Sequence, residues 1–243
     1  RSGFRRRVQP IFQNPYSSLD PRWPVARTVR EPLDAFRIGD RAAREARVIE
    51  LLDSVGLSAR HARSRPHELS GGQRQRVAIA AALALRPDLI VADEPVSALD
   101  VMVQAQILNL ICGLQRELGL TLVFITHDLA VVEHVADRVA VMYLGRIVES
   151  GPVSDVLAGP QHPYTRALLE AVPKPSPGPR PQRAAVRGEI PSPLAPPAGC
   201  HFHPRCPLAI DRCRVTAPAM TEFGVGHTAS CHVTAAIHDA KGA

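Results

Sequence analysis

The chain has 243 residues, 45% of them hydrophobic and 21% charged, so it can bury a full core as one large domain or two smaller ones. Its formal net charge of +6 would permit a nucleic-acid role, but aromatic residues make up only 4% and the arginines are scattered. We therefore expect no nucleic-acid partner, because a surface that stacks on bases needs aromatic side chains among clustered basic ones. No stretch approaches the ~18 apolar residues of a membrane span.

A short strand is predicted near the start, over residues 8–12, and it ends at Gln13. The stretch that follows, residues 14–22, reads NPYSSLDPR and is rich in turn-forming residues. A glutamine at a strand end can reach a metal-bound water. Taken alone, however, Gln13 is better interpreted as a polar strand terminus.

Helical patterns dominate residues 31–68. Apolar residues recur there at the spacing of one helix face, and Gly56 stands where a helix would end. The residues on that face are Val48, Leu51, Leu52 and Val55.

Residues 69–76 read LSGGQRQR and open onto an Ala-rich run, residues 77–85, that favours a helix. The two glycines, Gly71 and Gly72, let backbone N–H groups come close to an anion, and a helix N-terminus attracts phosphate. A glycine-rich helix cap without any ligand would give the same pattern.

An apolar run over residues 89–92 ends in two acids, Asp93 and Glu94. Such a run is typical of a buried parallel strand that delivers carboxylates to its C-terminal edge. One acid can hold a metal ion, and the other can act on water. The stretch SALD follows at residues 97–100, and Asp100 can cap the next helix.

The helix after Asp100 is expected to run to about residue 118, and another strand is predicted over residues 121–126. This strand delivers His127 to its C-terminal end, although a lone histidine at a strand end is usually structural. Two further strands are predicted at residues 139–143 and 146–149. Strands that alternate with helices predict an α/β fold with a parallel sheet.

Taken together, LSGGQ and the apolar run ending in Asp-Glu resemble the ABC ATPase family, in which they are the signature and Walker B motifs. The resemblance implies an α/β, P-loop NTPase-like ABC ATPase core with a parallel sheet over residues 1–160. Its helical subdomain would span about residues 14–85. The family also implies ATP and Mg²⁺ as cofactors.

The resemblance also implies roles for individual residues. Glu94 would be the general base, His127 would brace the attacking water and the γ-phosphate, and Gln13 would be the glutamine of the Q-loop. Asp93 and Gln13 would belong to the Mg²⁺ sphere. The residues expected to contact nucleotide are Ser70, Gly71, Gly72, Gln73, Asp93 and Asp100.

Two stretches narrow the resemblance to the oligopeptide and dipeptide importer ATPases: NPYSSLDPR at residues 14–22 and HPYT at residues 162–165. This subfamily implies a second ABC ATPase domain, identical or different, and two transmembrane permease subunits as partners. An extracytoplasmic peptide-binding protein would be an indirect partner. The expected location is the cytoplasmic face of the cell membrane, as a peripheral protein.

The C-terminal part is predicted to consist of a helix and a Pro-rich connector, residues 161–197, and a cysteine-containing extension, residues 198–243. Nothing points to secretion, so thiolate metal ligands are favoured over disulfides. The four clustered cysteines are Cys200, Cys206, Cys213 and Cys231.

The spacing of these cysteines lacks the CxxC pairs that are typical of structural zinc, so we favour a [4Fe–4S] cluster and keep zinc as the alternative. The stretch at residues 199–207 is similar to the GCxFHPRCP extension of the importer ATPases. Four unligated thiols on a small tail are the remaining interpretation, and we disfavour it because so small a segment needs a staple to order itself.

The phosphate-binding loop of the family, G-x-x-x-x-G-K-[ST], does not occur in the 243 residues. We expect it upstream of Arg1 in a longer natural polypeptide, and we expect the chain alone to be inactive. The alternative is a non-catalytic partner or regulatory subunit. Such a subunit would close the ATP site of another domain and sense redox state through its cysteines.

Overall fold

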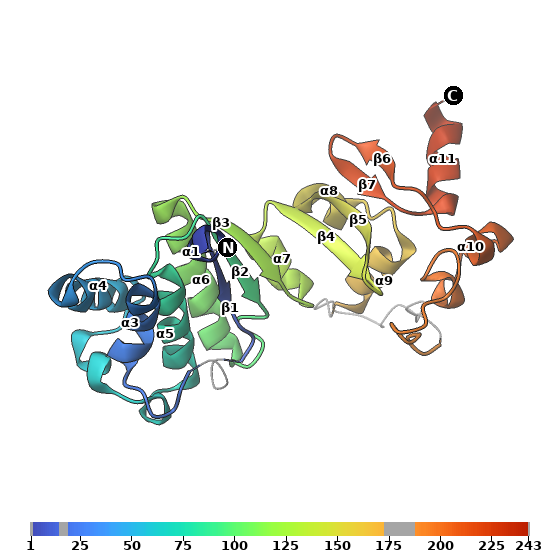
Figure 1. Cartoon of the computed structure of the whole chain (residues 1–243). Helices are drawn as coiled ribbons and strands as arrows, with labels where there is room; N and C mark the ends of the chain where they lie inside the picture. Colours follow the sequence, from blue (N-terminus) through green and yellow to red (C-terminus); the bar gives the residue numbers. More distant parts are fainter. Residues whose placement is uncertain (1, 15–18, 173–187, 243) are drawn as a thin grey trace. The chain divides into compact units, whose positions relative to one another are not determined.

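The computed structural model describes residues 2–14, 19–172 and 188–242. The chain divides into two compact units, residues 1–128 and 129–243, and each is described by itself (Figure 1). Part of the predicted Q-loop and most of the Pro-rich connector, residues 15–18 and 173–187, lie outside the described residues. The domain boundaries at residues 160 and 197 stay predictions.

A parallel three-stranded sheet forms the centre of the first unit (Figure 1). Its strands are β1 (Val8–Ile11), β2 (Leu89–Asp93) and β3 (Thr121–Ile125), in the order β1-β2-β3. A short helix, α1 (Ser2–Arg7), precedes β1. The predicted parallel sheet is confirmed, and the segments after the three strands leave it at one common edge.

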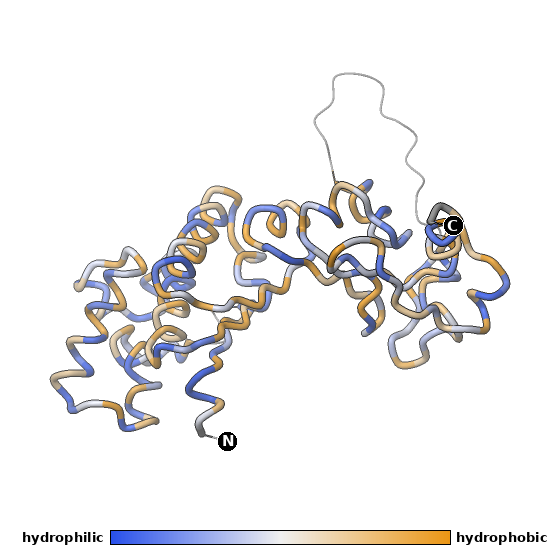
Figure 2. Tube along the Cα trace, turned by 90° about the horizontal axis from the view of Figure 1, so that it is seen from above, coloured by the Kyte–Doolittle hydropathy of each residue, from blue (hydrophilic) through white to orange (hydrophobic). Residues whose placement is uncertain are grey.

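Helices α5 (Gly71–Leu83) and α6 (Val101–Leu118) provide apolar side chains that pack against one face of this sheet. Side chains alternate between the two faces of a strand, so β3 presents Val123 and Ile125 to the opposite face, where they are 45% and 47% exposed. Figure 2 shows hydrophobic and hydrophilic residues alternating along the trace. The side chains that fill the packed face are Ile11, Ile79, Leu83, Ile90, Ile111 and Leu114.

The predicted helical stretch at residues 31–68 is divided into several elements. These are α3 (Val25–Ala35), α4 (Arg41–Ser54) and the 3₁₀ turns η1 (Ala59–Arg63) and η2 (Pro66–Glu68). The first of them begins earlier than predicted. The predicted apolar face of α4 is confirmed, because Val48, Leu51 and Leu52 are buried.

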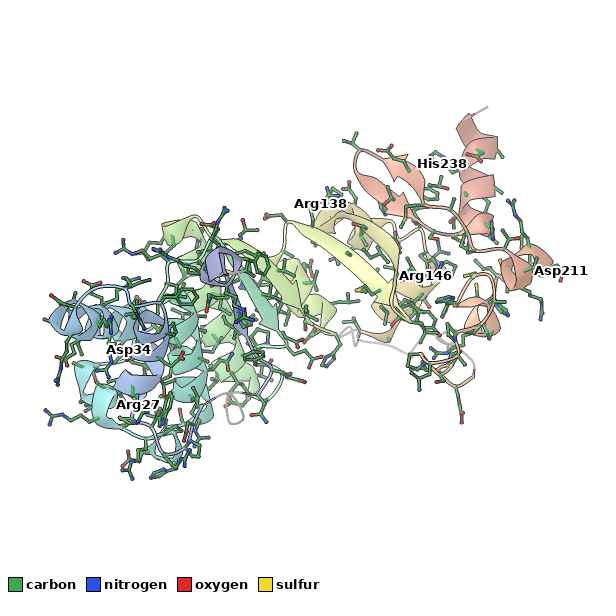
Figure 3. All side chains as sticks on the ribbon, in the orientation of Figure 1. Arg27, Asp34, Arg138, Arg146, Asp211 and His238 are labelled. Carbon is green, nitrogen blue, oxygen red and sulfur yellow. The ribbon has the colours of Figure 1, made fainter. Side chains whose placement is uncertain are left out.

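The break between α3 and α4 has a local cause. Gly39 adopts a left-handed φ of 69°, which favours glycine, and Asp40 is the N-cap of α4, accepting a hydrogen bond from the Ala43 N–H at 2.8 Å. An ion-pair network then joins the two helices through Asp34, labelled in Figure 3, which lies 2.9 Å from Arg30 and 2.8 Å from Arg44. The helical stretch at residues 31–68 is predicted from apolar spacing, which does not include these caps and charges.

The second unit begins with α7 (Leu129–Val135) and the antiparallel strands β4 (Arg138–Tyr143) and β5 (Arg146–Pro152). Figure 3 labels Arg138 and Arg146, the first residues of these two strands. The strands agree with the predicted pair, and the helices α8 (Val153–Ala158) and α9 (Pro163–Ala171) follow them.

The C-terminal region extends the same sheet. Its elements are η3 (His203–Arg205), α10 (Asp211–Val215), β6 (Thr221–Gly224), β7 (His227–Ala229) and α11 (His232–Gly242). Strand β7 pairs with β5, which gives the order β4-β5-β7-β6. Sequence reasoning did not foresee this pairing.

Phe202 is the largest fully buried side chain in the C-terminal region, and it packs in one core with Val141, Tyr143 and Val148. Its ring lies 5.2 Å from the Tyr143 ring, edge to face, and 5.4 Å from the Tyr164 ring. The region after residue 198 therefore shares a core with the strand pair. Among the described helices, none is both long and apolar enough to cross a membrane.

Candidate functional site

Three of the predicted site residues meet at the common edge of the parallel sheet. Gln13 follows β1, Glu94 follows β2 directly, and His127 follows β3. The Gln13 Nε2 donates a hydrogen bond of 2.7 Å to Glu94 Oε2, and His127 Nδ1 lies 3.0 Å from Glu94 Oε1. Both carboxylate oxygens are thus held by partners from the neighbouring strands.

The backbone of Glu94 is constrained as well. Its φ is 42°, in the left-handed region that non-glycine residues seldom adopt. Its N–H donates to the Ile125 carbonyl at 2.9 Å, and the Ser97 hydroxyl donates to its carbonyl at 3.1 Å. Such a conformation persists only where the surroundings determine it, and it is typical of functional sites.

The contacts of Glu94 lower the pKa of its carboxyl group. The hydrogen bond with His127 is the largest cause, burial opposes it, and the Gln13 amide adds to the lowering. The side chain is therefore ionised at neutral pH and can accept a proton. It is 24% exposed, whereas the His127 side chain is 78% exposed.

Asp93 is the last residue of β2 and is exposed at the same sheet edge. In the described ranges, no group of three His, Cys, Asp or Glu side chains could hold a metal ion. A single exposed carboxylate such as Asp93 still suits Mg²⁺, because this ion is commonly held by one or two carboxylates together with substrate phosphates and water. The Asp93 carboxylate and the Gln13 amide oxygen would hold the Mg²⁺ ion.

The signature residues form the N-terminus of α5. Ser70 is its N-cap: its hydroxyl accepts from the Gln73 N–H at 3.3 Å, and Gln73 Oε1 accepts from the Ser70 N–H at 2.9 Å. This reciprocal pair is a capping box. The side chains of Ser70 and Gln73 therefore stabilise the start of the helix.

Close packing explains the two glycines of the signature. A Cβ added to Gly72 would lie 2.5 Å from Val103 Cγ1, and one added to Gly71 would lie 3.2 Å from Leu99 Cδ2. The sequence offered phosphate binding or a ligand-free helix cap as the reason for these glycines, and neither includes this packing. Asp100 caps α6 as predicted, since it accepts from the Val103 N–H at 3.0 Å. The signature and the segment around Asp100 thus form a second group of predicted residues.

A groove with a volume of about 390 Å³ lies between β1, α3 and α5. Its walls are mostly apolar and include the Trp23 ring. The Arg27 guanidinium makes a cation–π contact with this ring, 4.0 Å from its centroid. Other lining residues are Phe12, Leu19, Thr28, Glu31 and Ala78.

All five cysteines are free thiols in the described part of the chain, and four of them lie in the C-terminal region. Burial raises the pKa of the Cys206 thiol to about 11 and also raises that of Cys200, and the neighbouring thiols add to both shifts. The Cys200 N–H donates to the Cys213 carbonyl at 2.9 Å. Cys213 and Cys231 are buried.

The four thiols therefore lie near one another, but the geometry does not support the predicted iron–sulfur cluster. No three donors among the described His, Cys, Asp and Glu residues stand as metal ligands. Two of the thiols, Cys200 and Cys206, pack against the core around Phe202.

Sequence reasoning missed Glu149, an acidic residue in a predicted strand. Its side chain is fully buried and bonds to three N–H groups. An acid beside apolar residues in a predicted strand is the signal in the sequence that could have found it.

Two family models match the chain. The ABC transporter family matches residues 1–97, and the C-terminal region of oligopeptide/dipeptide transporters matches residues 148–213. A probable peptide ABC transporter ATP-binding protein of Sinorhizobium fredii is 54% identical over 96% of this chain and 66% of its own length. A putative peptide import ATP-binding protein of Brucella ovis is 54% identical over 93% of this chain and 72% of its own length.

A dipeptide transport ATP-binding protein of Escherichia coli is 49% identical over 93% of this chain and 68% of its own length. Among solved structures, a dimeric ATP-binding cassette bound to ADP and phosphate is 34% identical, with a TM-score of 0.55 over 63% of this chain and 66% of that one. Another, part of an ABC transporter complex of Clostridium perfringens, is 32% identical, with a TM-score of 0.57 over 64% of this chain and 61% of that one. The chain thus spans about two thirds of the length of several of these proteins.

Proposed function

Because the chain belongs to the family of ATP-binding proteins of peptide ABC transporters, we propose that it is the ATP-hydrolysing subunit of an oligopeptide or dipeptide importer. The observation that carries the proposal is the meeting of Gln13, Glu94 and His127 at one sheet edge. A non-catalytic regulatory subunit would have no need for an ionised carboxylate held at both oxygens, so that alternative is not favoured.

The proposed mechanism uses the residues at this edge. Glu94 accepts the proton of the attacking water, and His127 holds the carboxylate in place and faces the reacting phosphate. Asp93 and Gln13 would hold Mg²⁺, which when bound would supply positive charge to the phosphates. The protein acts mainly by positioning these groups and by stabilising charge.

The signature acts on a different nucleotide in this proposal. Ser70, Gly71 and Gly72 contact ATP that is held on a second ATPase domain, and the backbone N–H groups of Gly71 and Gly72 face its phosphates. Our sequence contains no G-x-x-x-x-G-K-[ST] loop, so we propose that the 243-residue chain alone does not hydrolyse ATP. The test compares ATP hydrolysis by the chain with and without an added loop of this kind. Hydrolysis by the chain without the loop would refute the proposed inactivity.

We assign the groove between β1, α3 and α5 to a permease subunit. Its apolar lining and its position next to Gln13 would let membrane-subunit contacts reach the site. The further partners are a second permease subunit, a second ATPase domain and, indirectly, an extracytoplasmic peptide-binding protein. Binding to the permeases would hold the chain at the cytoplasmic face of the membrane.

The permease contact is tested by co-purification. Trp23→Ala removes the indole ring from the wall of the groove, so recovery of the chain with permease subunits in detergent should fall about tenfold. Leu118→Ala, at an exposed position of α6, is the matched control and should leave recovery unchanged. Equal recovery of both variants would contradict the assignment.

We keep an iron–sulfur cluster at Cys200, Cys206, Cys213 and Cys231 as a proposal, supported by the mutual proximity of the thiols and not by a formed metal site. Protein purified without oxygen should be brown and should lose its visible absorbance on Cys206→Ser. Colourless protein with stoichiometric zinc would favour the zinc alternative. No step of ATP hydrolysis depends on this group.

The main experiment measures ATP hydrolysis in lipid vesicles. The chain is joined to a segment with the G-x-x-x-x-G-K-[ST] loop and assembled with a second ATPase and two permease subunits. A peptide-loaded binding protein should then raise the hydrolysis rate severalfold, as expected if binding is coupled to the ATPase. ATP hydrolysis that does not respond to peptide would agree with an ATPase but would refute the proposed role in peptide import.

A further inference from the structure

Glu149, on β5, has a completely buried side chain (0% exposed), which is rare for a charged residue. Three N–H groups approach its carboxylate. The Gln161 N–H donates to Oε1 at 2.7 Å, the His162 N–H donates to Oε2 at 2.9 Å, and His227 Nε2 lies 2.8 Å from Oε1. These donors offset the cost of removing a carboxylate from water.

Two of the donors belong to the start of α9. His162 is the N-cap of this helix, and its Nδ1 accepts from the Tyr164 N–H at 3.1 Å. Helix N-termini leave N–H groups unpaired and carry partial positive charge, so a carboxylate there stabilises the first turn. Burial lowers the pKa of His162 to about 4, so its ring is neutral at neutral pH and still accepts this bond.

The third donor belongs to β7, which attaches the β6–β7 hairpin to β5. The pairing is short: Glu149 lies opposite Ala229, and the Ser230 N–H donates to the Val148 carbonyl at 2.8 Å. A Cβ added to Gly151 would lie 3.2 Å from the His227 Cα, so the glycine leaves room for this close approach. Two side chains add to this ladder: Arg138 Nη2 donates to the Gly226 carbonyl at 2.9 Å, and the Thr228 hydroxyl donates to the Ser150 carbonyl at 3.4 Å. Of the contacts that hold the hairpin, the one between Glu149 and His227 also involves the start of α9.

We propose that Glu149 couples the attachment of the β6–β7 hairpin to the first turn of α9, so that the two form and open together. In the described part of the chain, His227 bonds to Glu149 and not to the α9 backbone. Loss of the His227 donor leaves a buried carboxylate short of partners. The buried Glu149 side chain then becomes exposed to water, and the N–H groups of residues 161 and 162 lose their hydrogen bonds to it.

Residue-resolved hydrogen exchange of the whole chain tests the coupling. His227→Leu removes the donor and should speed exchange at least about tenfold at Ser230 and also at Gln161 and His162. His227→Gln keeps a donor and should restore most of the protection. Faster exchange at Ser230 with unchanged rates at Gln161 and His162 would overturn the proposal.

A control variant and an experiment on the unmodified chain keep the test decisive if His227→Leu folds poorly. Glu170→Gln, at an exposed position of α9, is the matched control and should leave all three rates unchanged. In the unmodified chain, increasing amounts of urea below the unfolding transition should bring the three amides to one common opening free energy. Separate opening free energies, with different urea dependence, would show that the two elements open independently.

Discussion

Gln13 and Glu94 lie 81 positions apart in the chain, and the Gln13 amide donates a hydrogen bond of 2.7 Å to the Glu94 carboxylate. His127 occupies the other carboxylate oxygen. The Glu94 carboxylate is thus held from both neighbouring strands, and its orientation depends on the register of the parallel sheet. A displacement of either neighbouring strand would change the direction in which Glu94 points.

We predict that His127→Ala raises the pKa of the Glu94 carboxyl, because the hydrogen bond with His127 is the largest cause of its lowering. Gln13→Leu should raise it less, since Gln13 is the last of the causes. Carbon-detected NMR titration of the side-chain carboxyl measures both shifts. An unchanged pKa in the His127 variant would refute the assigned contact.

The packing of the signature predicts a second outcome. Gly72→Ala places a methyl group against Val103 and should lower the unfolding free energy by about 1–3 kcal/mol. The double variant with Val103→Ala should recover most of the loss. Urea unfolding measures both.

Gly113, in the middle of α6, is the matched control for that substitution. A Cβ there meets nothing within 4 Å, so Gly113→Ala should stabilise the chain by about 0.5–1 kcal/mol through helix propensity. If the two alanine variants behave alike, the glycine at position 72 is not required by packing.

His162 predicts a pH dependence of stability. Its pKa falls from 6.5 to about 4 on folding, so between these values the unfolded state binds more protons. Stability is therefore lost as the pH falls through this window, by about 3 kcal/mol in all. His162→Asn keeps a helix cap without the titration and should flatten this part of the profile. An equal slope in both proteins would contradict the burial of a neutral histidine.

The sequence predicted the parallel sheet and placed Gln13, Glu94 and His127 each at the end of a strand. The three side chains meet because the C-terminal ends of parallel strands share one edge. The roles that the family resemblance implies for these residues stay predictions. Asp100 as the cap of α6 followed from its local position before a helical run.

Other features could not be read from local patterns. The pairing of β7 with β5 joins residues 78 or more positions apart, and its strands are too short for a clear period-2 signal. The close approach of Gly72 to Val103 and the burial of Glu149 depend on tertiary packing. The four cysteines predicted a metal site, and no group of metal ligands is found among the described residues.

The most direct test of the account is single-turnover ATP hydrolysis by Glu94→Gln, in a chain extended with a G-x-x-x-x-G-K-[ST] segment. Glu117→Gln, an exposed acid of α6, is the control. We predict that Glu94→Gln lowers the hydrolysis rate by about 10²–10⁴-fold while nucleotide binding is kept, and that the control has no effect. Hydrolysis by Glu94→Gln at the unmodified rate would contradict the assignment of Glu94 as the base and, with it, the proposed site.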